Sequence, residues 1–100
     1  MSDFEGRLAA LRARFRDRLI EERDWFGCFA AGGAAADAEA ARDRSHKLCG
    51  IAGSMGYGAV SDAARALEQV LMDDAARSDV AGRRADLLAT LNAALADGTD

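Results

Sequence analysis

The chain has one histidine, and it lies in the stretch 45–56, where residue types and spacing could support chemistry. On a helix, which turns about 100° per residue, His46, Gly50 and Gly53 fall on one stripe. Apolar side chains such as Leu48 fall on the opposite face. Each glycine inside a helix costs about 1 kcal/mol relative to alanine, so helix stability does not account for two of them. We interpret the bare stripe as clearance for a molecule that approaches the histidine ring, with close helix packing as the alternative.

Several chemical roles are open to this histidine. The simplest is a surface residue without a function. A zinc site would need three or four protein ligands, whereas only Cys49 follows His46 at helical spacing, and Cys28 should lie on another helix. A Cys49–His46 nucleophilic pair would need an oxyanion hole and a cleft, which a convex helix face does not provide. Ser45 points about 100° away from His46, so the two do not form a dyad.

A phosphoryl carrier is the role that the neighbouring residues favour. A neutral imidazole nitrogen is a nucleophile near neutral pH, and it can hold a phosphoryl group as a phosphoramidate. Such a site needs an exposed ring, room for a partner and a cation to balance the phosphate charge. Arg42 lies one turn before His46 and Lys47 lies next to it, so both are candidate cations. Gly50 and Gly53 would provide the room.

The composition indicates one small helical domain, spanning residues 1–100. Alanine makes up roughly a quarter of the chain and proline is absent, while β-branched residues are scarce, so helices are favoured over strands. The net charge of −4 argues against nucleic-acid binding. No apolar run approaches the ~20 residues of a membrane span and no signal peptide is visible. We expect a cytoplasmic protein with free thiols at Cys28 and Cys49.

The apolar periodicity predicts four helices. The first spans residues 3–31 and ends at Gly32–Gly33. The alternative to one straight helix is a bend or break near residues 18–24. Its apolar stripe consists of Phe4, Leu8, Leu11, Phe15, Leu19, Phe26 and Phe29. The second helix spans residues 37–56, with Asp37 as its N-cap and Gly56 as its C-cap.

The third predicted helix spans residues 58–76, and the fourth follows a cap at Ser78 or Asp79 and ends near residue 96. Each helix has one apolar face. Short connections make neighbouring helices antiparallel. The sequence therefore predicts an all-α, up-down-up-down four-helix bundle.

The stretch from His46 to Gly56, with the residues that follow it, resembles the histidine phosphotransfer (HPt) domain family. The family pattern is His-x-Leu-Lys-Gly-x-Ala/Ser-x-x-x-Gly, followed by a run like Leu-x-x-x-Ala-x-x-Leu-Glu. The matching positions are His46, Leu48, Gly50, Ala52, Gly56, Val60, Ala64, Leu67 and Glu68.

The resemblance implies a phosphocarrier that is not an enzyme with an ATP site of its own and that needs no cofactor. We expect it to be a monomer. His46 would accept a phosphoryl group from a receiver-domain aspartate, or from a hybrid histidine kinase, and pass it to another receiver. The receiver would supply the Mg²⁺ and the acidic pocket. No nucleic acid, membrane or resident metal is expected as a partner.

The sequence departs from the family pattern at Cys49, where the family usually has a lysine that contacts the phosphoryl group. Arg42, on the same stripe as His46, is the preferred substitute, and Lys47 is the second candidate. The missing lysine also suggests an alternative function. The chain would then be a helical adaptor that retains the HPt bundle without transferring phosphoryl groups.

Overall fold

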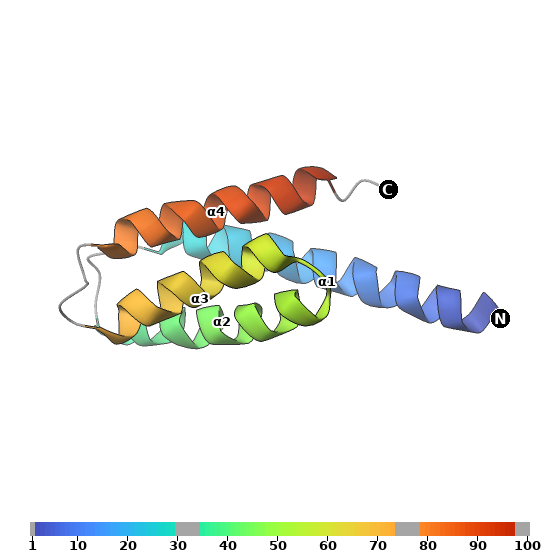
Figure 1. Ribbon diagram of the computed structural model, residues 1–100, viewed down its shortest axis with the longest axis horizontal. Helices are drawn as coiled ribbons and strands as arrows, with labels where there is room; N and C mark the ends of the chain where they lie inside the picture. Colours follow the sequence, from blue (N-terminus) through green and yellow to red (C-terminus); the bar gives the residue numbers. More distant parts are fainter. Residues whose placement is uncertain (1, 30–34, 74–78, 98–100) are drawn as a thin grey trace.

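A computed structural model of the chain describes residues 2–29, 35–73 and 79–97, which form four helices and no strand (Figure 1). The helices are α1 (Ser2–Cys28), α2 (Ala35–Ser54), α3 (Gly58–Met72) and α4 (Val80–Asp97). Successive helices run in opposite directions, α2 packs along α3, and α4 packs on α3 and α1. This arrangement confirms the predicted all-α, up-down-up-down four-helix bundle. None of the helices in these ranges is long and apolar enough to cross a membrane.

The long N-terminal helix α1 is continuous, so the break considered near residues 18–24 does not occur. Glu22 explains the continuity, because it occupies the inward position between Leu19 and Phe26 and is only 1% exposed. Two arginines bind its carboxylate: Arg18 Nε at 2.9 Å and Arg44 Nη1, from α2, at 2.7 Å. The charged turn therefore joins the core instead of interrupting it, and its ion pairs connect α1 to α2.

Other helix ends differ from the predicted ones. Helix α2 begins at Ala35, so Asp37 is not its N-cap but an acidic residue of its first turn, where it suits the positive end of the helix dipole. Alanine is the strongest helix former, which explains the earlier start. Helix α3 ends at Met72, not near residue 76, since Asp73 is extended and an acidic side chain is unfavourable at the negative end of a helix. Helix α1 ends at Cys28 and not at residue 31, and the predicted stop at Gly32–Gly33 lies outside the described residues.

The turn between α2 and α3 is a Schellman motif, in agreement with the predicted C-cap. Gly56 has a φ of 85°, a left-handed conformation that favours glycine. The Tyr57 N–H donates to the Ala52 carbonyl at 2.8 Å, and the Gly56 N–H donates to the Gly53 carbonyl at 3.3 Å. These bonds satisfy carbonyls at the end of α2 and turn the chain directly into α3.

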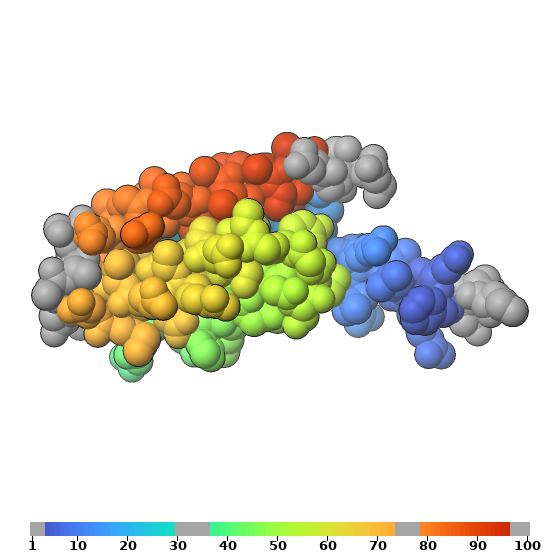
Figure 2. Space-filling view, in the orientation of Figure 1, coloured from blue at the N-terminus to red at the C-terminus, as the bar shows by residue number. Residues whose placement is uncertain are grey.

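The core contains apolar side chains from all four helices: Phe15, Leu19, Phe26, Phe29, Ala41, Leu48, Ala52, Val60, Ala64, Leu67, Val80, Leu87, Leu91 and Leu95. The predicted stripe of α1 was wrong at its N-terminal end. Phe4 is 72% exposed and Leu11 is 50% exposed, because α1 extends past the ends of its neighbours (Figures 1 and 2). The first turns of α1 therefore have apolar residues that no other helix of the bundle covers.

Candidate functional site

His46 lies in the middle of α2, and its side chain is 73% exposed. The adjacent Ser45 and, on the opposite face, Leu48 are fully buried. The structure thus confirms that the histidine faces solvent on the side of α2 away from the core. An exposed ring on a rigid helix can meet an incoming group without rearrangement of the bundle.

Glu68 of α3 is the direct partner of the histidine ring. Its Oε2 lies 2.8 Å from His46 Nδ1, and its side chain is 19% exposed. Because a carboxylate can only accept, Nδ1 donates the hydrogen bond, and in the neutral ring Nε2 then holds the lone pair. The sequence pattern included Glu68 but assigned it no role. In the sequence, its position directly after Leu67, which is buried, indicates that it borders the α2–α3 interface.

The two glycines on the histidine stripe have different surroundings. A Cβ on Gly50 would meet no atom within 4 Å, so the backbone one turn after His46 is open. A Cβ on Gly53 would lie 3.3 Å from Ser61 Oγ of α3. Gly53 therefore permits close packing of α3, which was the alternative interpretation. The open position of Gly50 fits the clearance role, which stays a prediction for both glycines.

The two candidate cations differ in how free they are. Lys47 Nζ lies 3.0 Å from Asp43 Oδ2, in an exposed ion pair one turn apart on α2. Arg42 forms no ion pair with any residue in the described ranges. It lines a hollow of about 500 Å³ beside the histidine. That hollow is otherwise lined by Glu39, Ala40, Asp43, His46 and Glu68. Arg42 is thus the more available cation, although three carboxylates surround it.

Cys49 replaces the lysine of the family pattern and is half-buried against α3. Its Sγ lies 3.5 Å from Ser61 Oγ, and Ser61 Oγ donates to the Cys49 carbonyl at 2.8 Å. Cys28 and Cys49 are both free thiols, as predicted. Within the described ranges no cluster of three or more histidine, cysteine or acidic side chains is close enough to hold a metal ion. Cys49 is thus a small side chain that packs against α3 beside the site.

The comparison with protein families agrees with this geometry. The family model of the Hpt domain matches residues 1–98, so the chain belongs to the Hpt domain family. Members of this family carry phosphoryl groups on histidine in phosphorelays and act with receiver domains and histidine kinases. The searches of curated proteins and of solved structures gave no match.

Proposed function

We propose that this protein is a phosphorelay intermediate, which accepts a phosphoryl group on His46 from a receiver-domain aspartate and transfers it to a second receiver. The observation that carries the proposal is the exposed ring with Nδ1 bound to Glu68 at 2.8 Å, on a chain of the Hpt domain family. The hydrogen bond selects the tautomer in which Nε2 faces the partner as a nucleophile.

The transfer step uses the Nε2 lone pair. It attacks the phosphorus of the aspartyl phosphate, the P–N bond forms, and the P–O bond to the aspartate breaks as the carboxylate leaves with the electron pair. The ring keeps its Nδ1 proton and becomes positively charged, and the Glu68 carboxylate offsets that charge. In the second transfer the same steps run in reverse toward another aspartate. The receivers supply Mg²⁺ and the acidic pocket, so the carrier needs no cofactor of its own.

A transfer assay tests the proposal. Receiver domains from the same genome are charged with acetyl phosphate and Mg²⁺ and mixed with the protein. We expect an acid-labile, alkali-stable phosphoryl group on this chain, mapped by mass spectrometry to His46, from at least one receiver. If no receiver labels the folded protein, the alternative of a helical adaptor without phosphotransfer, suggested by Cys49, replaces the proposal.

Charge compensation at the missing lysine is a further part of the proposed mechanism. Arg42→Ala should slow transfer, or shorten the lifetime of the phosphohistidine, several-fold. A cation near the phosphoryl group contributes on the order of 1 kcal/mol where water reaches it. Lys47→Ala should have a smaller effect, because Lys47 is already paired with Asp43. Single-turnover rates and phosphohistidine decay measure both effects, with Arg83→Ala on α4 as the control.

A larger loss in Lys47→Ala than in Arg42→Ala would reverse this assignment. Wild-type behaviour in both variants would mean that the receiver alone supplies the counter-charge.

A further inference from the structure

Arg65 is an exposed residue of α3 on the side of that helix that packs along α2. We propose that Arg65 binds the phosphoryl group on His46, from α3 and at the height of Cys49. The proposal rests on the proposed function, since it assigns a further phosphoryl-binding side chain to the same histidine. It is independent of Arg42, which lies on α2, one turn before the ring.

Contacts between α2 and α3 fix the height of Arg65 relative to the site. Ser61 Oγ donates to the Cys49 carbonyl at 2.8 Å, and Glu68 Oε2 lies 2.8 Å from His46 Nδ1. Arg65 lies between these two contacts along α3, four residues after Ser61 and three before Glu68. Because the two helices are antiparallel, Arg65 lies beside the turn of α2 that runs from His46 to Cys49.

The helix period places Arg65 at the outer border of this contact. It lies about 40° around α3 from Ser61 and about 60° from Glu68. The rotation is away from Ala64 and Leu67, which are fully buried. Arg65 therefore borders α2 and still faces solvent. A long side chain at this position can reach across the surface of α2 to a group held on the histidine ring.

The guanidinium of Arg65 is available for an anion. It forms no hydrogen bond or ion pair with any residue in the part of the chain that the structure describes. Asp62 and Glu68 are three residues away on either side, but Glu68 is bound to the histidine ring. A phosphoryl group brings close to two negative charges, and a guanidinium offers it two parallel N–H donors. Phosphorylation of His46 therefore gives this cation an anionic partner.

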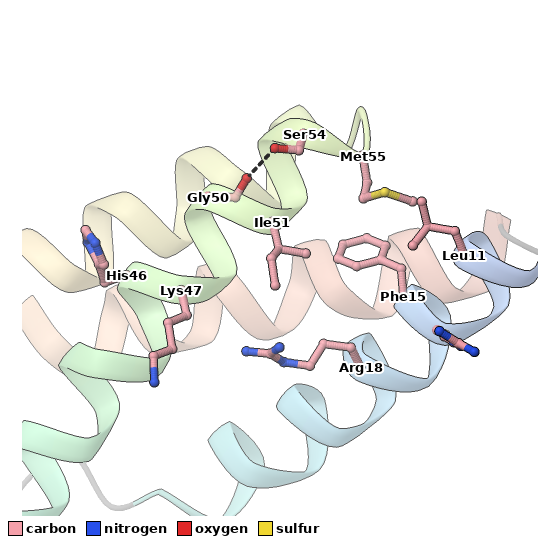
Figure 3. Close-up of a pocket in the computed structure, with 10 residues that line it drawn as sticks. Leu11, Phe15, Arg18, His46, Lys47, Gly50, Ile51, Ser54 and Met55 are labelled. Atoms are coloured by element: carbon pink, nitrogen blue, oxygen red, sulfur yellow. Dashed lines mark hydrogen bonds between the residues drawn. The ribbon is translucent and has the colours of Figure 1, made fainter. Parts of the chain in front are cut away.

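The residues of α2 that follow His46 leave this role open. His46 and Lys47 leave α2 in different directions (Figure 3), and Lys47 Nζ lies 3.0 Å from Asp43 Oδ2. Cys49 is small, uncharged and half-buried against α3. At the height of Cys49 the positive charge therefore comes from α3, where Arg65 borders the same turn of α2.

Phosphorus NMR of the phosphorylated protein tests the contact. Phosphoramidate phosphorylates His46 without a receiver, and the dependence of the phosphorus signal on pH gives the pKa of the bound phosphoryl group. A nearby cation favours the doubly charged form and lowers that pKa. We expect Arg65→Ala to raise it by about half a unit. Arg65→Lys should raise it less, because the charge remains without the two parallel donors. Arg83→Ala on α4 is the control and should leave it unchanged.

Transfer from a receiver and a rescue variant complete the test. Arg65→Ala should slow single-turnover transfer about fivefold. Cys49→Lys places a cation on α2 at the same height, so it should return the phosphoryl pKa and the transfer rate of Arg65→Ala close to the wild-type values. Arg65 is also a third source of counter-charge. Wild-type behaviour of Arg42→Ala and Lys47→Ala therefore assigns the counter-charge to the receiver only if Arg65→Ala behaves in the same way.

An unchanged phosphoryl pKa in Arg65→Ala would overturn the proposal, and so would a failure of Cys49→Lys to restore it. Slower transfer with an unchanged pKa would place Arg65 against the receiver and not against the phosphoryl group, which also overturns the proposal. The NMR measurement needs no receiver, so it is separate from the proposed function. If no receiver transfers to the wild type but the pKa rises in Arg65→Ala, the proposed function fails and the contact of Arg65 with the phosphoryl group is supported.

Discussion

Replacing Glu68 with alanine should slow phosphoryl transfer to His46 by roughly 10- to 100-fold, because a hydrogen bond to a charged group contributes about 1.5–3 kcal/mol. In the proposed mechanism, the bond of 2.8 Å between Nδ1 and Glu68 Oε2 holds the ring and leaves Nε2 as the nucleophile. Without the carboxylate, the ring rotates more freely and both tautomers are populated. The positive charge that develops on the ring also loses its partner.

The same substitution removes a negative charge that repels the incoming phosphoryl group, so the two effects oppose each other. Repulsion between unit charges about 6 Å apart in water is only about 0.7 kcal/mol. The loss of positioning is therefore the larger effect, and transfer slows. Glu68→Gln should fall between wild type and Glu68→Ala, because the amide oxygen can still accept from Nδ1 but has no full charge.

Single-turnover transfer from a charged receiver measures these rates, and phosphorus and nitrogen NMR identify which ring nitrogen holds the phosphoryl group. We expect only Nε2 in the wild type and a detectable fraction on Nδ1 in Glu68→Ala. Gln69→Ala, at the next and exposed position of α3, is the matched control. A Glu68→Ala variant that transfers at the wild-type rate, and on Nε2 alone, would exclude this positioning role.

Replacing Gly50 with glutamine should leave the bundle intact while lowering transfer on the order of 100-fold, because displacement of reacting groups by about 1 Å can cost that much. A Cβ at this position meets no atom within 4 Å, so the side chain does not disturb the fold. Loss of a helix glycine should even stabilise α2 by up to about 1 kcal/mol. The glutamine then occupies space one turn from His46 that a receiver needs.

Gly82→Gln is the matched control, since Gly82 is also a helix glycine with no atom near its Cβ position, but it lies on α4. Thermal unfolding shows whether either variant changes stability. Reaction with phosphoramidate shows whether His46 itself remains reactive, because this small reagent needs no docking space. Wild-type transfer by Gly50→Gln would contradict the clearance role.

The local features of the site were predictable from the sequence, because the angular positions of residues on a helix follow from its period alone. That period separates His46 and Gly50 from the buried Leu48 and Ala52. The turn at Gly56 was also predictable, since it depends only on the glycine and on hydrogen bonds within a few residues of it. The family pattern is short and lies close to the histidine, so the membership of the chain was also recognisable in spite of the departure at Cys49.

What only the tertiary structure decided is which neighbour meets each helix face. Glu68 lies 22 residues from His46, and it reaches the ring only because the tight turn at Gly56 sets α3 against α2. The same packing places Ser61 against Gly53, which its sequence neighbours could not reveal. Glu22 interrupts the apolar pattern of α1, yet it is buried, because arginines from two helices neutralise it.

In the N-terminal part of α1, apolar residues that the sequence pattern assigns to the core are exposed. The apolar period correctly assigns residues such as Leu11 to one face, but burial requires another helix at that height of the bundle. The first turns of α1 extend past the ends of the neighbouring helices (Figure 1), and Leu11 is 50% exposed. Periodicity determines the direction in which a side chain points, whereas the lengths and packing of the other helices determine whether anything covers it.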